Sequence, residues 1–286
     1  MILRVIALLL LASPLLAQPV FIRDSVTAMR SQDDNFGGFS AIHVFPGGSS
    51  FVALTDRGYI LNGRFQRQNG QISGLEFSPL LPILDTKGIP LGNNDTDAEG
   101  LAIAEDGTLF ISFESNNRIM RHASQTSAAE FLPKHPDFNN LQTNSGLEAL
   151  AISRDVIYAL PERSGDVTRP FPVYRFQTGQ WDTALSVPRR PPFLMVGADV
   201  FEGQLYVLER HLAGISGFIT RIRRFDIGYT LINEQTLFTS RAGQFDNLEG
   251  ISIWRDSSGQ IRATVISDDN FNFFQRSQIV EFILNN

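Results

Sequence analysis

Acidic or amide residues stand at the start of several short apolar segments of this chain, and these segments recur at regular spacing. Asp97 and Glu99 precede one such segment, and Asn247 and Glu249 precede another, two residues apart in each case. If these segments are strands, residues two apart project to one face, so the members of each pair are presented together. Glu148 opens a third segment. Oxygen donors without nitrogen or sulfur are the ligands that Ca²⁺ prefers.

A second set of acids lies at the end of the apolar run that follows each of these segments and could pair with it. Residues 97–114 read DAEGLAIAEDGTLFISFE, in which two alternating apolar runs flank an Asp106-Gly107 turn. Antiparallel pairing across that turn would bring Glu99 and Glu114 to the same end of a hairpin. The closing acids of the comparable stretches lie roughly 50 residues apart, a spacing typical of a repeated unit. They are Asp56, Glu114, Glu162, Glu209 and Asp268.

Carboxylates gathered at one place repel one another unless a cation lies between them or their pKa values rise. We therefore predict a Ca²⁺ site, with the closing acids as possible further members. The predicted ligands are Glu99, Glu148, Glu249, Asp97 and Asn247. For the closing acids, pairing with nearby arginines such as Arg163 is the competing interpretation, because such pairs bridge neighbouring strands.

Few other residues offer reactive chemistry at that end of the hairpins. His211 follows a closing acid and is the candidate general base, although a solvated loop histidine is the competing interpretation. Arg57 and Arg210 are candidate contacts for a substrate anion. The sequence contains no GxSxG nucleophile motif, P-loop or GxGxxG motif.

The repeated hairpins predict an all-β propeller, in which each repeat forms one blade. Five hairpins can be recognised in the sequence. The runs 20–29 and 278–284 are expected to pair with each other and close the ring, which protects the sheet edges. Counting that pair as a further blade gives a prediction of six blades, with five or seven as alternatives. We expect one propeller domain over residues 18–286.

Residues 1–17 have the features of a secretory signal peptide. Arg4 precedes a short apolar run that ends near Ala17, and that run is too short to span a membrane. A buried or membrane-anchoring helix is the competing interpretation. We expect cleavage near Ala17, a periplasmic or secreted mature protein, and no membrane span after cleavage.

Composition limits the remaining possibilities. The chain has no cysteine, which excludes disulfides, thiolate metal sites and cysteine nucleophiles. The 24 basic and 30 acidic residues give a net charge of −6, and removing Arg4 with the signal leaves 23 − 30 = −7. This charge argues against a nucleic-acid partner. We expect a monomer that acts on a small molecule.

The blocks GGFSAI with TDRG, DAEGLAIAEDGTLFISFE, NSGLEALA with PE, and DNLEGI with SDDNF resemble the phytase-like family of exported propeller proteins, described as having the esterase-like activity of phytase. The resemblance follows most of the mature chain in order. It departs at VGADVFEGQLYVLE, which lacks the opening acid, and in the short length of the chain. It implies a propeller fold and suggests hydrolysis of esters or phosphate esters.

Two functions from different classes are consistent with these residues. The first is a Ca²⁺-dependent hydrolase of phosphate esters or related esters, with water activated at the acids. The second is a non-catalytic propeller that binds a ligand or partner and holds a structural cation. A convincing base or nucleophile near the acids would discriminate them, and His211 is the one candidate.

Overall fold

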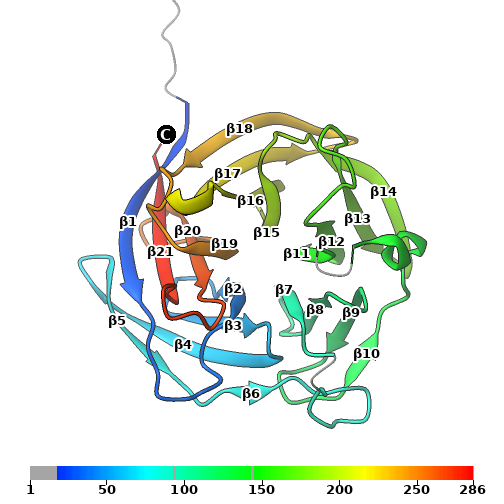
Figure 1. Ribbon diagram of the computed structural model, residues 1–286, viewed down its shortest axis with the longest axis horizontal. Coiled ribbons are helices and arrows are strands. Elements are labelled where there is room, and N and C mark those ends of the chain that lie inside the picture. The colour runs from blue at the N-terminus through cyan, green and yellow to red at the C-terminus, as the bar shows by residue number, and fades with distance from the viewer. Residues whose placement is uncertain (1–17, 93–94, 143–144, 286) are drawn as a thin grey trace, which may run out of the picture.

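The computed structural model describes residues 18–92, 95–142 and 145–285. The predicted signal peptide lies outside these residues. The described chain is an all-β propeller whose sheets are arranged radially around one axis (Figure 1). Within this part of the chain, no helix combines the length and apolar character needed to cross a membrane.

Each blade is an antiparallel sheet, named here from the axis outward. The first blade comprises β2 (Phe39–Val44), β3 (Ser50–Thr55), β4 (Tyr59–Gln68) and β5 (Gln71–Phe77), with β6 (Leu81–Pro82) paired to β4. The second comprises β7 (Ala98–Ile103), β8 (Leu109–Phe113), β9 (Arg118–His122) and β10 (Ala129–Phe131). The third comprises β11 (Leu147–Ser153), β12 (Val156–Pro161), β13 (Phe171–Gln177) and β14 (Gln180–Val187).

The fourth blade comprises β15 (Leu194–Phe201), β16 (Gln204–Leu212), β17 (Phe218–Ile227) and β18 (Leu231–Thr239). The fifth comprises β19 (Asn247–Arg255), β20 (Ile261–Asp268), β21 (Gln278–Asn285) and, outermost, β1 (Val20–Ala28). Two short 3₁₀ helices lie in connections, η1 (Pro136–Asn140) and η2 (Gly214–Ser216).

The propeller has five blades, so the prediction of six is wrong. The five predicted hairpins are the two inner strands of the five blades. The terminal strands β1 and β21 do pair antiparallel, from Val20 with Asn285 to Ala28 with Gln278. They complete the blade that β19 and β20 begin instead of forming another one, because that hairpin supplies only half of a four-stranded sheet.

The hydrophobic core lies between the blades. Each of its clusters joins two adjacent sheets; one, for example, packs Val196 and Leu208 of the fourth blade against Ile251 and Val265 of the fifth. Both faces of the inner strands are therefore covered, which explains why strands such as β11 are apolar at nearly every position. This packing fixes the inner strands β2, β7, β11, β15 and β19 in a closed ring.

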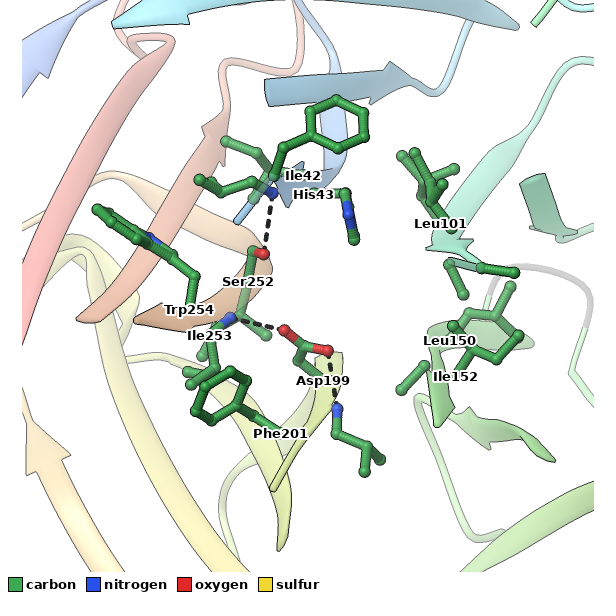
Figure 2. A pocket seen from close by; sticks show the side chains of 18 of the residues that line it. Ile42, His43, Leu101, Leu150, Ile152, Asp199, Phe201, Ser252, Ile253 and Trp254 are labelled. Atoms are coloured by element: carbon green, nitrogen blue, oxygen red, sulfur yellow. Dashed lines mark hydrogen bonds between the residues drawn. The ribbon is translucent and has the colours of Figure 1, made fainter. Parts of the chain in front are cut away.

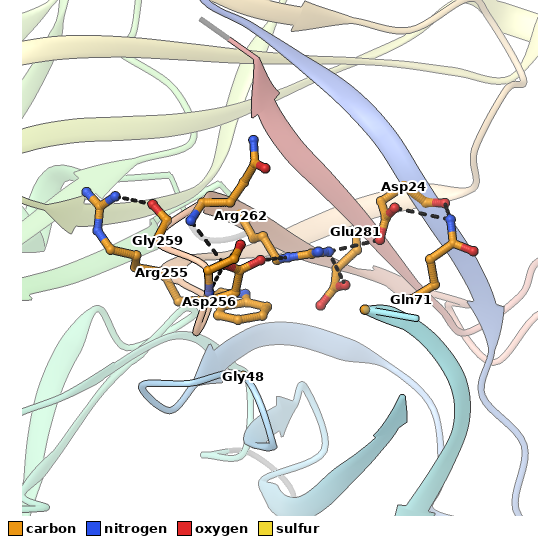
Figure 3. Close-up of polar contacts among 12 residues, drawn as sticks. Asp24, Gly48, Gln71, Arg255, Asp256, Gly259, Arg262 and Glu281 are labelled. Atoms are coloured by element: carbon orange, nitrogen blue, oxygen red, sulfur yellow. Dashed lines mark hydrogen bonds and ion pairs between the residues drawn. The ribbon is translucent and has the colours of Figure 1, made fainter. Parts of the chain in front are cut away.

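A network of buried and partly buried charges joins the strands of the fifth blade to one another and to the first blade (Figure 3). Arg262 of β20 bonds to Asp24 of β1 at 2.9 Å, to Asp256 at 2.8 Å and to Glu281 of β21 at 3.3 Å. Arg67 of the first blade bonds to the same Glu281 at 2.6 Å. We call these residues the closure network, because they join both terminal strands to two blades.

Candidate metal centre

The acids that open the inner strands lie at β-bulges. The pairing between β7 and β8 shifts register between Ala98 and Gly100, which leaves Glu99 as the extra residue. The same shift leaves Glu148 extra in β11 and Glu249 extra in β19. A bulge inserts one residue and re-aims its side chain. The bulges thus direct three glutamates of three blades toward one mouth of the propeller axis.

The other two inner strands carry the same bulge without an acid. Ser40 is the extra residue in β2, and Val196 is the extra residue in β15. Ser40 instead donates a hydrogen bond of 2.7 Å from Oγ to the carbonyl oxygen of Ala98 in the next blade. Five equivalent positions therefore surround the axis, and glutamate occupies those of the second, third and fifth blades.

Small residues follow these positions because the inner strands pass very close to one another. A Cβ on Gly100 would lie 2.7 Å from Cβ of Leu150, and a Cβ on Gly250 would lie 2.7 Å from Cα of Ala41. Neither position has room for a side chain. The glycines therefore let the acid-bearing strands converge on the axis.

Asp97, Glu99 and Glu114 form a compact group of carboxylates in the second blade. One ligand oxygen from each lies within 4.8 Å of the others. The Asp97 carbonyl oxygen accepts a hydrogen bond from the Glu114 backbone N–H at 2.9 Å, and its carboxylate accepts one from Ser115 Oγ at 2.8 Å. Glu99 and Glu114 meet as the hairpin argument predicted. The spacing of these oxygens suits a shared cation.

Glu148 extends this group from the third blade. Its side chain hydrogen-bonds to the Glu114 carboxyl, which also accepts the backbone N–H of Gly146. Two carboxyl groups can share such a bond only if one of them holds a proton. Within the described residues, Asp97, Glu99, Glu114 and Glu148 form no ion pair with Lys, Arg or His, so a proton or a cation must balance their charge.

Glu249 differs from these four acids because it forms an ion pair with a guanidinium group. Arg210 of β16 donates from Nη1 to Glu249 and, at 2.7 Å, to Asn247, while its Nη2 lies 3.1 Å from Glu162. Asn247 donates in turn to Glu249 at 2.8 Å and to Asp268 at 3.3 Å. Although burial alone would lower the pKa of Arg210, Glu249, Glu148 and Glu162 raise it above its usual value. Arg210 is therefore a fixed countercharge within the acids.

Burial and mutual repulsion change the acidity of the glutamates. Burial raises the pKa of Glu99 and of Glu148 well above the usual range, and neighbouring carboxylates raise both further. Burial raises the pKa of Glu114 to about 7. The pKa of Glu249 is also raised by burial, with Arg210 acting in the opposite direction. Clusters of such shifted groups are characteristic of functional sites.

Asp56 and Asp268 border the group from the first and fifth blades. Burial raises the pKa of each to about 7; Asp268 contributes further to the shift of Asp56, and Glu249 to that of Asp268. The Asp56 Oδ1 atom is buried without a hydrogen-bond partner. Such an orphaned carboxylate oxygen is the kind of atom that a bound cation would satisfy. Together with Asp97, Glu99, Glu114, Glu148, Glu162 and Glu249, these two residues form what we call the acidic cluster.

Three predicted site residues form no hydrogen bond or ion pair with the acidic cluster among the described residues. Glu209 is fully buried and bonded to Arg221 at 2.7 Å and to Arg223 at 2.5 Å, as the arginine-pairing interpretation describes. His211 alternates with Arg210 on β16, so it faces the opposite side of the strand, where its ring lies 6.0 Å from that of Phe193. The Arg57 guanidinium lies 3.2 Å above the ring of Phe271.

Sequence reasoning did not identify the bulges, and it considered Arg210 as a partner of closing acids but did not predict its bonds to Glu249 and Asn247. The bulges have one sequence signal, the recurrence of a small residue directly after each opening position. These residues are Ala41, Gly100, Ala149, Gly197 and Gly250.

A protein-family model described as Phytase-like, with the esterase-like activity of phytase, matches residues 34–271. The chain belongs to the phytase-like family. Its matched region contains every residue of the acidic cluster. No curated protein sequence matches the chain.

Solved structures share the fold at low sequence identity. The PQQ-bound aldose sugar dehydrogenase of Streptomyces coelicolor is 13% identical, with a TM-score of 0.51 over 91% of this chain and 98% of that one. The catalytic domain of the GH62 α-L-arabinofuranosidase of Coprinopsis cinerea is 9% identical, with a TM-score of 0.53 over 93% and 97%. At these identities the likeness concerns the fold alone.

Proposed function

We propose that this phytase-like propeller is an exported, Ca²⁺-dependent hydrolase of phosphate esters or related esters, acting at the acidic cluster. The observation that carries the proposal is the gathering of Asp97, Glu99 and Glu114 within 4.8 Å without an ion pair in the described part of the chain. The family match supports ester hydrolysis. The predicted signal peptide supports export.

The contacts of these side chains suggest which of them would hold the cation and which would position the others. Asp97, Glu99 and Glu114 would hold the cation, with Glu148 and Glu249 next to them. When bound, Ca²⁺ would supply electrostatic polarisation of the ester and of a water molecule. Arg210 keeps Glu249 and Asn247 in place through its hydrogen bonds.

Proton transfer falls to carboxyl groups in this proposal. His211 faces away from the acidic cluster, whereas Asp56 and Asp268 border it and have a pKa of about 7. A general base works best when its pKa lies near the working pH. A phosphate ester approaching this mouth would be repelled by the carboxylates unless the cation were present, so turnover should require the metal.

The test is turnover with added Ca²⁺ on a panel of p-nitrophenyl phosphate, phytate, a phosphotriester, a lactone and an aryl ester. Glu99→Gln and Glu249→Gln should each lower turnover by at least ~100-fold, since even residues behind metal ligands cost 10–100-fold. Glu130→Gln is the matched control, because Glu130 lies exposed on β10 beside Arg121. Full activity in both Glu99→Gln and Glu249→Gln would refute the proposed hydrolase activity.

A second candidate is a non-catalytic propeller with a structural cation. It is favoured by one observation: the N–H groups of Arg210 are already directed at Glu249, Asn247 and Glu162, so this guanidinium is not available for a substrate anion. Saturable Ca²⁺ binding with no turnover of any panel compound would support this candidate over the hydrolase.

A further inference from the structure

The opposite mouth of the propeller axis contains an apolar cavity (Figure 2). The acidic cluster lies where the inner strands begin, whereas this cavity of about 470 Å³ lies where they end. Every blade contributes a wall to it. The principal wall residues are Ile42, Leu101, Leu150, Ile152, Phe201 and Trp254.

A constriction separates the cavity from the acidic cluster. The free space between them is about 10 Å³, bordered by Glu99 and Glu148 on one side and by Leu101 and Ile251 on the other. That space holds at most about one water molecule. A ligand in the cavity would therefore not touch the proposed metal ligands, and the inference below does not depend on the proposed function.

The polar side chains that line the cavity include His43, Glu105, Asp199, Ser252 and Arg255. Ser252 Oγ accepts the backbone N–H of Val44 at 3.0 Å, and Arg255 is paired with Glu202 at 2.7 Å. Asp199 and His43 differ in whether their hydrogen bonds are satisfied. Both carboxylate oxygens of Asp199 accept backbone N–H groups, from Val200 at 2.8 Å and from Ile253 at 2.6 Å. The ring of His43 contacts that of Phe45 with centroids 5.2 Å apart. Among the described residues, neither nitrogen of His43 bonds to a protein group. Burial lowers the pKa of His43 to about 4, so the ring is neutral at neutral pH and offers one donor and one acceptor.

We propose that this cavity binds a neutral, largely apolar molecule, about the size of a two-ring aromatic compound, whose single hydroxyl or carbonyl group hydrogen-bonds to His43. The volume lies within the usual range of ligand pockets, which are mostly apolar with a few placed polar groups. An anion would meet the carboxylates of Asp199 and Glu105, and the Arg255 guanidinium in the lining is already paired with Glu202 at 2.7 Å. A cation would gain little from Asp199, because both of its oxygens already accept hydrogen bonds.

Titration calorimetry with 2-naphthol on the metal-stripped protein tests the site. Ala104 lies on the cavity rim just after β7, and its backbone alone bonds to the turn, so Ala104→Trp should fill the cavity without unfolding the blade. Ala184→Trp on the exposed outer strand β14 is the matched control. We expect one saturable site in the wild type and in the control, with affinity at least tenfold lower in Ala104→Trp. Equal affinity in Ala104→Trp, or no binding in the wild type, would overturn the proposal.

His43 and ligand charge are tested with related compounds. His43→Phe should weaken 2-naphthol roughly fivefold, the worth of one net hydrogen bond, and leave naphthalene unchanged. Naphthalene binding can be followed by the fluorescence of Trp254 in a Trp181→Phe background, because the chain has only two tryptophans. We expect 2-naphthoate to bind at least tenfold more weakly than 2-naphthol. Equal affinity for both compounds, or an unchanged 2-naphthol affinity in His43→Phe, would contradict the assigned ligand chemistry.

Discussion

Two regions of this propeller that contain buried carboxylates balance them in different ways. In the closure network, the fully buried Glu281 receives Arg67 and Arg262, and Arg262 also bonds to Asp24 and Asp256 (Figure 3). The acidic cluster has more carboxylates, yet within the described residues only Glu162 and Glu249 of the cluster form ion pairs, with Arg163 and Arg210.

The difference indicates which region is structural and which is a site. A buried charge without a partner costs several kcal/mol, so a sequence that keeps it must gain something in return. The closure network satisfies its charges and joins the chain ends. In the acidic cluster, Asp97, Glu99, Glu114 and Glu148 have no ion pair within the described part of the chain, so their charge needs a proton or a cation. The predictions below test this contrast.

The largest effect is expected from Glu281→Gln. Removing one side of a buried ion pair costs about 3–5 kcal/mol, because Arg67 and part of Arg262 lose their counterion. Urea unfolding at neutral pH would measure the loss. Glu130→Gln is again the matched control, since its exposed pair with Arg121 should contribute less than about 1 kcal/mol. Similar small losses in both variants would mean that the closure network does not stabilise the ring.

The pH dependence of the metal-free protein should follow the acidic cluster. The pKa values of Asp56, Glu114 and Asp268 rise from 3.8 or 4.5 in the ordinary state to about 7 in the folded one. The native state then binds more protons than the unfolded state, so the free energy of unfolding falls as pH rises from about 4 to 7.

Thermal unfolding in chelator would measure this dependence. We expect the midpoint to be at least about 5 °C higher at pH 5 than at pH 7.5, since one group with its pKa raised to about 7 contributes about 2.7 kcal/mol over this range and each kcal/mol corresponds to roughly 2–4 °C. Asp256 does not alter this comparison: although burial raises its pKa, hydrogen bonds from Ser258 and Arg262 lower it below 3.8, so its contribution changes only below about pH 4. A midpoint that rises steadily from pH 5 to 7.5 would contradict the repulsion in the cluster.

A smaller effect of opposite sign is expected from Glu99→Gln without metal. The substitution removes one buried carboxylate from a group whose members repel one another. Because an unpaired buried charge costs several kcal/mol, we expect the metal-free variant to be more stable by on the order of 1–3 kcal/mol at pH 7.5 in urea unfolding. A loss of stability as large as that of Glu281→Gln would show that Glu99 has a structural partner.

The sequence was sufficient to predict the two inner strands of every blade. The five hairpins combine alternating apolar residues with a turn, and both signals are local. The predicted number of blades was wrong because the sequence indicates that β1 and β21 are strands but does not indicate that they join the sheet of β19 and β20. Only the pairing of all four strands shows that they share one sheet.

The sequence predicted the residue types of the site better than it predicted the relative positions of their side chains. Spacing brought Glu99 and Glu114 together correctly, because both lie on one hairpin. A bulge, however, exists only in the register between two strands, so no spacing argument could place Glu99 at one. Glu209 shows a further limit: it matches Glu162 in the repeat, but Glu162 pairs with Arg210, which also pairs with Glu249 of the cluster, whereas Glu209 pairs with Arg221 and Arg223 of the neighbouring strand.

The most direct test of the account is the thermal midpoint of the mature protein at pH 7.5, stripped with chelator and then titrated with Ca²⁺, Mg²⁺ and Zn²⁺. Binding to the native state stabilises it by about 2.7 kcal/mol at a ligand concentration 100 times the Kd. We predict a saturable rise that is selective for Ca²⁺ and absent in Glu99→Gln and Glu249→Gln. No shift with any ion would contradict the metal centre and leave the acidic cluster balanced by protons alone.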